Sequence, residues 1–219
     1  MAVLSIASAK GGCGKTSLAL LLGVEFALDG YKVALLDCDL NQHASAFGLK
    51  AKMPGFEVLP DIGEQIVLKA LREAEAEADL VLVDLPGGSS TLALKALQRS
   101  HFVIIPAQPS LPDARDAMKT VAQIDDAQEL AKTPIPRALV WTRFLPGFES
   151  LVARHVRQSM EGQDVPILKA ALMERAAFRA IHLTGTVPRQ TDPKGTAAQN
   201  VAALTKEVLH RLQVKQVIA

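Results

Sequence analysis

Residues 8–17 read SAKGGCGKTS, and the types and spacing of these residues could bind the phosphates of a nucleotide. An apolar run precedes the loop and an apolar helical pattern follows it, so backbone amides at the helix start would face phosphate oxygens. Lys15 would reach the β- and γ-phosphates, and the Thr16 hydroxyl would complete a Mg²⁺ shell. The expected nucleotide contacts in the loop are Gly11, Gly12, Cys13, Gly14, Lys15, Thr16 and Ser17.

A second lysine, Lys10, lies at the mouth of the same loop. The common phosphate-loop pattern G-x-x-x-x-G-K-[ST] has no requirement at this position, and it has glycine where this chain has Ala9. Lys15 already supplies the cation that one nucleotide needs. The loop residues alone leave the partner of Lys10 open.

Three aspartates end two other apolar runs. The segment VALLDCD ends in Asp37 and Asp39, and the segment LVLVD ends in Asp84. A carboxylate after a buried strand commonly holds a water bound to Mg²⁺, and Asp84 fits that role. A strand-terminal aspartate can also cap the next helix, but the phosphate loop favours a role in the nucleotide site.

Apolar runs alternate with helical patterns along the chain, which predicts a doubly wound α/β fold with a mostly parallel sheet and helices on both faces. Several runs lack alternation, as strands buried on both faces do. The expected strands are 3–9, 32–37, 80–84, 102–106, 137–142 and 165–170. The expected helices are 16–28, 62–77, 113–131, 150–162 and 196–212, and residues 50–63 are expected to form a loop with room for one short strand. Ligands of such sheets bind at the carboxyl ends of the strands.

The composition is that of one globular domain. The 219 residues, 49% hydrophobic and 21% charged, suffice for a single buried core, so we expect one domain over 1–219. An apolar run of transmembrane length and a signal peptide are both absent from the sequence, which predicts a cytoplasmic protein. Cys13 and Cys38 suit neither a disulfide framework nor a zinc site, and we expect free thiols.

Charge is distributed unevenly along the chain. Residues 1–136 carry 12 Lys and Arg against 17 Asp and Glu, and residues 137–219 carry 12 against 6, which gives net charges of −5 and +6. A basic surface can bind polyanions. Solvated helix faces produce the same asymmetry, so charge alone leaves both interpretations open.

Together the motifs resemble those of the deviant Walker A ATPases of the ParA/MinD class, over nearly the whole chain. The resemblance rests on K-G-G-x-G-K-[ST], with Lys10 and Lys15, and on D-x-D at Asp37 and Asp39. The apolar strand that ends in Asp84 completes it. It implies a P-loop NTPase fold, ATP and Mg²⁺ as cofactors, and ATP hydrolysis.

The same resemblance implies a role for each matching residue. Lys10 would be the signature lysine, which crosses a nucleotide-sandwich homodimer to the phosphates of the other subunit and makes dimerisation depend on ATP. Thr16 would bind Mg²⁺ directly, Asp84 would hold it through water, and Asp37 would support the metal shell. Asp39 would position the attacking water.

Two segments depart from the class. Leu40 and Asn41 stand where these ATPases usually have Pro-Gln, and residues 85–88, LPGG, stand where many partition proteins have Cys-Pro-Pro. Neither departure removes a phosphate or metal ligand, but both bear on the hydrolysis rate and on the subfamily.

Longer stretches resemble particular members of the class. Residues 84–113 are similar to short plasmid-partition ATPases of the ParF kind and to the accessory ATPase that acts on T-DNA borders. Residues 171–185 and 192–209 resemble the segment around the adenine and the final helix of those proteins. The resemblance places Arg175 at the nucleotide base, while Phe178 is expected in the core.

The resemblance also implies DNA binding. The first strand begins at Val3, which leaves no room for an N-terminal helix-turn-helix extension, so sequence-specific repression is not expected. Binding without sequence preference would rest on Lys and Arg contacts with phosphates. The candidates in the basic part of the chain are Arg154, Arg157, Arg179, Arg189, Lys194, Lys206 and Arg211.

Three other functions compete with this one. A MinD-like membrane-associated positioning ATPase would end in a basic amphipathic helix, and the final segment LHRLQVKQVIA mixes apolar and basic residues but lacks aromatic anchors. An iron–sulfur reductase would need cysteines at a cluster, which Cys13 and Cys38 do not supply. A small-molecule ATP-dependent ligase of the same fold, such as dethiobiotin synthetase, would not explain Lys10.

The function that the sequence favours is therefore a slow ATPase that is associated with the nucleoid in the cytoplasm. It would position plasmid DNA, chromosomal DNA or a protein cargo, and a ParB-like or cargo adaptor protein would stimulate its hydrolysis of ATP.

Overall fold

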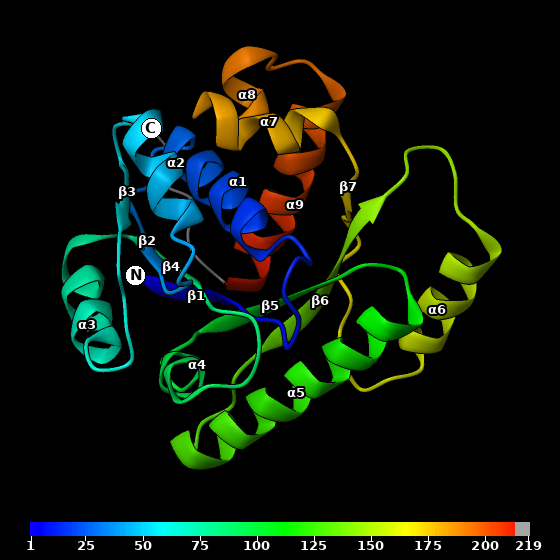
Figure 1. Ribbon diagram of the computed structural model, residues 1–219, viewed down its shortest axis with the longest axis horizontal. Coiled ribbons are helices and arrows are strands. Elements are labelled where there is room, and N and C mark those ends of the chain that lie inside the picture. Colours follow the sequence, from blue (N-terminus) through cyan, green and yellow to red (C-terminus); the bar gives the residue numbers. More distant parts are fainter. Residues whose placement is uncertain (213–219) are drawn as a thin grey trace.

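The computed structural model describes residues 1–212, in which seven parallel strands form one sheet with helices on both faces (Figure 1). The strand order is β3-β2-β4-β1-β5-β6-β7. The strands are β1 (Ala2–Ile6), β2 (Val33–Asp37), β3 (Phe56–Leu59), β4 (Leu80–Asp84), β5 (Phe102–Ala107), β6 (Arg137–Phe144) and β7 (Leu172–Met173). The helices are α1 (Lys15–Leu28), α2 (His43–Ala51), α3 (Val67–Glu77), α4 (Thr91–Leu97), α5 (Leu111–Ala131), α6 (Leu151–Glu161), α7 (Ala176–Thr184), α8 (Pro188–Thr191) and α9 (Thr196–Leu212). The predicted doubly wound α/β fold is confirmed.

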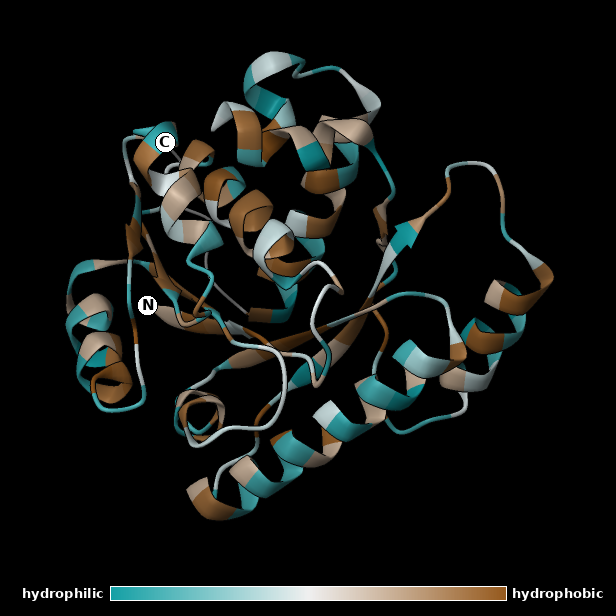
Figure 2. Cartoon of the chain, in the orientation of Figure 1, coloured by the Kyte–Doolittle hydropathy of each residue, from teal (hydrophilic) through white to brown (hydrophobic). Residues whose placement is uncertain are grey.

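Two hydrophobic layers hold the sheet between the helices. One layer joins the sheet to α1, α2, α7 and α9, and the other joins it to α3, α4, α5 and α6. Every residue of β1, β2, β4 and β5 is buried, which explains why these strands read as unbroken apolar runs. Figure 2 shows the contrast between the brown strands and the teal outer faces of the helices. Among residues 1–212, no helix combines the length and apolar character needed to cross a membrane.

The topology places a crevice beside β1. From β1 the chain passes to β2 on one side, and later from β4 to β5 on the other side of β1, so the direction of winding reverses there. The register aligns Asp84 with both Ile6 of β1 and Asp37 of β2. The two aspartates therefore lie at the same level as the start of the phosphate loop, at the carboxyl edge where such sheets bind ligands.

The strand expected at residues 165–170 does not form. This segment makes one isolated bridge to β6, and the edge strand is β7, immediately beyond it. Pro166 has no amide hydrogen to donate. The Glu207 carboxylate accepts the amides of Lys169 and Ala170, each at 2.9 Å. The Leu168 amide makes the one bridge, to the carbonyl of Leu139 at 2.8 Å. Extending the strand to either side would need the amides of residues 166 and 170, of which one is absent and the other bonded to Glu207, so the prediction was wrong.

Other elements agree in kind and differ in extent. The first strand ends at Ile6 rather than residue 9, where the phosphate loop begins, and β3 lies in the segment 50–63 that was expected to be mostly loop. The helix expected from residue 62 begins at Val67, because the Ile62 amide donates to the carbonyl of Asp37 and joins the loop to β2. The short helices α2, α4, α7 and α8 were not predicted.

Candidate nucleotide and metal site

The phosphate loop connects β1 to α1 inside this crevice. Gly14 is the N-cap of α1 with φ 95°, a left-handed conformation that glycine adopts without strain. Gly11 and Gly12 are exposed, and neither amide donates a hydrogen bond within residues 1–212. Free amides at the start of a 14-residue helix are groups of the kind that bind anions.

Asp84 is the most unusual carboxylate of the site. It is fully buried at the end of β4, and neither of its oxygens accepts a hydrogen bond from the described residues. Burial raises the pKa of Asp84 to about 7. The nearby Thr16 hydroxyl lowers this pKa in part, the Asp37 carboxylate raises it further, and the Lys15 ammonium lowers it. A cation that approaches a buried carboxylate without hydrogen-bond donors stabilises its charged form.

These oxygens fit Mg²⁺, which prefers carboxylate, hydroxyl, phosphate and water ligands. Within the described residues, no three His, Cys, Asp or Glu side chains converge as a metal cage. Thr16 and Asp84 would therefore hold the ion together with phosphate and water oxygens rather than alone. Lys15 is buried beneath the loop, and its ammonium donates to the carbonyl of Lys10 at 3.3 Å.

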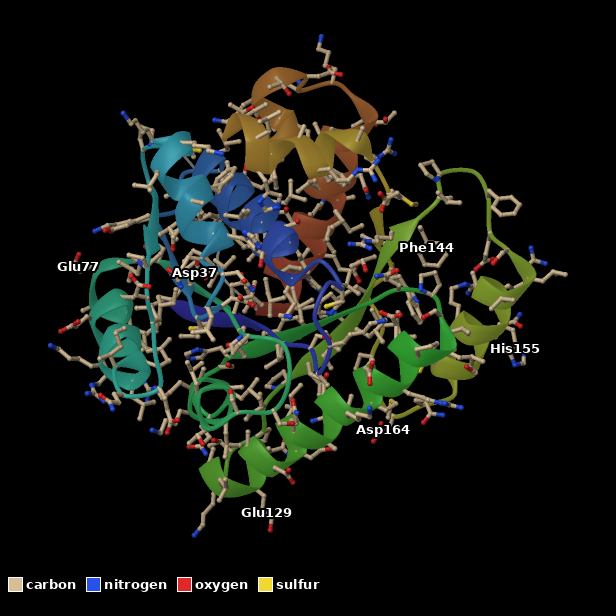
Figure 3. The ribbon with its side chains drawn as sticks, in the orientation of Figure 1. Asp37, Glu77, Glu129, Phe144, His155 and Asp164 are labelled. Carbon is tan, nitrogen blue, oxygen red and sulfur yellow. The ribbon has the colours of Figure 1, made fainter. Side chains whose placement is uncertain are left out.

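Asp37 is the buried last residue of β2 and lies beneath α2 (Figure 3). Its Oδ2 accepts both the amide and the hydroxyl of Ser45 at 2.8 Å, and its Oδ1 accepts the amide of Asp39 at 3.3 Å. The carboxylate thus joins the end of β2 to the start of α2 and shapes the loop that carries Asp39.

Asp39 is held by its own loop through one of its two oxygens. Its Oδ1 accepts the backbone amide of Asn41 at 2.9 Å and the side-chain amide of Asn41 at 2.8 Å. The other oxygen accepts no hydrogen bond within residues 1–212, so it is available to a water molecule. One of the two departures from the class, Asn41, therefore supports the aspartate that the sequence predicts to be catalytic.

The other departure brings two loops close together. A Cβ atom on Gly87 would lie 3.1 Å from the amide nitrogen of Gly11 and 3.3 Å from its Cα, so a side chain here would require the phosphate loop to shift slightly. The amide of Gly88 donates to the carbonyl of Ser8 at 3.2 Å. The LPGG sequence thus permits backbone contact between the loop after β4 and the phosphate loop.

Lys10 is separate from the phosphate cradle of its own chain. Its ammonium pairs with the Asp113 carboxylate at 3.0 Å, and the two side chains are 39% and 6% exposed. Asp113 lies in the first turn of α5, where the Ser110 side chain caps the helix. Sequence reasoning missed Asp113, which lies in the first turn of the helix after β5 rather than at the end of a strand, as Asp84 does.

Arg175 lies beside the phosphate loop. A pocket of about 180 Å³ is lined by Arg175 and by Cys13, Gly14 and Ser17 of the loop. The Arg175 Nη1 donates to the Thr196 hydroxyl at 2.8 Å, and its Nε is buried without a partner among the described residues. Arg175 therefore shares a pocket with the start of α1, next to the phosphate loop.

Further contacts of this pocket were not foreseen. The Thr142 hydroxyl, at the end of β6, donates to the carbonyl of Cys13 at 3.1 Å. The Ser17 hydroxyl lies 2.9 Å from Nε2 of His182 in α7, and burial lowers the pKa of this histidine. Phe178 is buried in the core, as expected. Thr142 and His182 are distant in sequence from the loop, and no pattern around them signals the contact.

Both cysteines are free and buried. The Cys13 thiol donates to the carbonyl of Lys10 at 3.6 Å. Burial raises the pKa of Cys38, and the carboxylates of Asp84 and Asp37 raise it further, so its thiol stays protonated. The expectation of free thiols is confirmed.

The comparisons with known proteins agree with this geometry. The family model described as VirC1 protein matches residues 1–210. "Protein ParA" of Rhizobium radiobacter is 28% identical over 217 residues, with 97% of this chain and 98% of the relative covered. The maintenance of carboxysome distribution protein A of Halothiobacillus neapolitanus is 26% identical over 211 residues, with 94% and 95% covered. The solved ATP complex of a Cyanothece McdA variant has a TM-score of 0.81 at 16% identity, with 100% of this chain and 99% of that chain covered.

The family match spans nearly all of the described chain, and the relatives align along their whole length. The solved McdA complex shares the fold of this chain. This chain belongs to the VirC1 protein family, within the ParA/MinD-type deviant Walker A ATPases.

Proposed function

We propose that this protein is an ATP-dependent positioning ATPase that works as one domain. ATP closes a homodimer, the dimer binds DNA without sequence preference, and a partner protein stimulates hydrolysis and release. The cargo is plasmid DNA, chromosomal DNA or a protein assembly distributed over the nucleoid. The names of the relatives support both kinds of cargo, since one is called ParA and another maintains carboxysome distribution.

The placement of Lys10 carries the proposal. Its ammonium lies at the mouth of the loop on Asp113 and is more than one-third exposed, whereas Lys15 occupies the cradle itself. A lysine in this position is available to phosphates that approach from a second subunit. Two triphosphates buried face to face concentrate negative charge, and a cation from each partner neutralises charge that only the dimer creates.

The binding residues follow from the site. The amides of Gly11, Gly12, Cys13 and Gly14 would hold the phosphates with Lys15, and Ser17 and Arg175 would contact the rest of the nucleotide. Thr16 and Asp84 would hold Mg²⁺, which supplies charge neutralisation at the phosphates, with Asp37 supporting this shell. The Cyanothece relative was solved as an ATP complex, which supports ATP as the ligand.

Asp39 would position the attacking water through its free oxygen, while Asn41 fixes the other oxygen. A single carboxylate held in this way favours slow turnover until a partner orders the loop. Slow basal hydrolysis suits a switch, which times a bound state rather than supplying metabolic flux.

A MinD-like membrane function is less well supported by the described residues. Leu209 is buried and Leu212 packs partly against the core, so neither presents an apolar face to a lipid surface. The remaining part of the segment proposed for a membrane, residues 213–219, lies outside the described residues. A ligase of the same fold would leave Lys10 without a purpose.

The test of the proposal is the oligomeric state of the purified protein with ATP and with ADP, measured by light scattering after size-exclusion chromatography. The wild type is compared with Lys10→Ala and with Lys119→Ala, an exposed lysine of α5 that pairs with Asp116. We expect ATP to produce a dimer in the wild type and in Lys119→Ala but not in Lys10→Ala. A Lys10→Ala protein that dimerises as fully as the wild type would refute the proposal, as would rapid ATP turnover without DNA or partner.

A further inference from the structure

A large open groove lies at the end of the sheet opposite to the nucleotide site. It has a volume of about 1020 Å³ and is formed by the amino ends of β5 and β6, the end of α5 and the last turns of α9. Its lining includes the basic side chains of Arg137, Lys169, Lys206 and Arg211, against two carboxylates, Asp164 and Glu207.

The four basic side chains outnumber the two carboxylates of the groove, and three of them have no ion-pair partner in the described part of the chain. Both carboxylate oxygens of Glu207 accept hydrogen bonds from backbone amides of the segment before β7. Arg137 pairs with Asp125 at 2.8 Å. Lys169, Lys206 and Arg211 form no ion pair with any residue of the described range 1–212. Three exposed cations without a direct ion-pair partner in residues 1–212 thus line one concave surface.

Ion pairing separates these residues from four of the five other basic candidates; the fifth, Lys194, is also unpaired within residues 1–212 but does not line the groove. Arg154 and Arg157 pair with Glu149, and Arg179 pairs with Glu174. Arg189 pairs with acidic residues of α1 and of the turn after it. A cation that already has a carboxylate partner gains less from a phosphate, because it must give up the first contact.

We propose that this groove holds the phosphate backbone of DNA, with Lys169, Lys206 and Arg211 as its contacts. The inference rests on the proposed function and assigns its DNA-binding surface. Contacts of this kind read no sequence, since phosphates carry no base information. The apolar side chains of Phe102 and Ile135 in the groove are both buried. A lipid surface would require exposed apolar anchors, so this concave basic surface suits the phosphate backbone of DNA better.

The groove lies at the amino edge of the sheet, away from the nucleotide site. In the proposed dimer, which joins two subunits at their nucleotide sites, the two grooves would lie at the far ends. Each groove would therefore hold its own stretch of DNA, and the contacts of one groove with phosphates set its affinity at a given salt concentration.

The experiment measures binding of the full chain to random-sequence duplex DNA of about 30 base pairs, with ATP and with ADP, over a range of salt concentrations. The groove variant is Lys206→Ala with Arg211→Ala. The matched control is Arg72→Ala with Lys52→Ala, which removes the same charge from two exposed residues, on α3 and at the end of α2, that have no ion pair in residues 1–212. Size-exclusion chromatography with ATP confirms that each variant still forms the dimer.

We expect the groove variant to bind DNA at least about 60-fold more weakly at about 0.1 M salt, since each lost phosphate contact costs about eightfold there. Its slope of log K against log salt should fall by about 1.8 per groove, while the control stays within about threefold of the wild type. Equal losses in variant and control, or no loss in the variant, would refute the groove while leaving the proposed function intact.

Two other results would have a different meaning. A wild type that dimerises with ATP but binds no DNA would refute the DNA part of the proposed function together with the groove. Binding to anionic vesicles of phosphatidylglycerol, but not to DNA, that is lost in the groove variant would show that the cations serve a membrane surface and would also overturn the assignment.

Discussion

The buried carboxylate of Asp84 predicts an unusual dependence of stability on pH. Its pKa in the folded protein is about 7, compared with an ordinary value of 3.8. The folded state therefore binds this proton more tightly than the unfolded state does, and folding loses stability as pH rises through the window from about 4 to 7. With about 1.4 kcal/mol for each pKa unit, the total penalty is about 4 kcal/mol, of which about 3 kcal/mol accrues between about pH 5 and pH 8.

The perturbation is Asp84→Asn, which keeps the shape and removes the titration. The amide has its own cost of burial without partners, and this cost does not depend on pH. The assay is therefore the free energy of unfolding by urea of wild type and variant, without nucleotide or Mg²⁺, at about pH 5 and pH 8. The variant should be more stable relative to the wild type at the higher pH by about 3 kcal/mol.

The matched control is Asp126→Asn, an exposed carboxylate in the second half of α5. Its relative stability should change by less than about 0.5 kcal/mol between the two pH values. If Asp84→Asn shows the same small change as the control, the carboxylate is not a buried, unpartnered group in solution. Asp84 would then have no special need of a cation.

Two further predictions concern packing around the site. Gly87→Ala should weaken binding of a fluorescent ATP analogue by about tenfold, because the added Cβ would displace the amide of Gly11. The control, Gly63→Ala, places its Cβ where no atom lies within 4 Å and should bind the analogue normally. Equal affinities of the two variants would show that the loops do not touch. Arg189→Ala should destabilise the protein by about 3 kcal/mol near pH 8, because it leaves the buried Glu25 carboxylate without its ion-pair partner. The loss should be smaller near pH 5, because burial raises the pKa of Glu25 and a protonated Glu25 needs no ion pair. Urea unfolding measures the second effect, and an equal loss at both pH values would contradict it.

The fold could be predicted from the sequence where local pattern and tertiary context agree. The central strands are buried on both faces and read as continuous apolar runs, so five of them were located within a few residues. The segment 165–170 is also largely apolar, but two of its backbone amides, those of Lys169 and Ala170, are bonded to Glu207, about 40 positions later in the chain. An interaction at that separation leaves no local signal.

The candidate site divides in the same way. The loop and the three aspartates each lie at the end of an expected strand. Because the carboxyl ends of parallel strands share one edge of the sheet, the sequence predicts that these residues lie close together. The contacts of Lys10 with Asp113 and of Ser17 with His182 join residues 103 and 165 positions apart. They depend on how α5 and α7 pack on the sheet, which periodicity does not specify.

The contact between Lys10 and Asp113 sets an energetic condition for the proposed switch. To reach a partner's phosphates, the ammonium has to leave a carboxylate that is only 6% exposed and that would then lack its cation. Removing one member of such a pair is costly, because the remaining charge stays poorly solvated. The phosphates across the dimer must therefore offer more than Asp113 does. A bound triphosphate carries more charge toward the interface than a diphosphate, so the same ion pair that holds Lys10 in the free subunit would let the protein distinguish ATP from ADP.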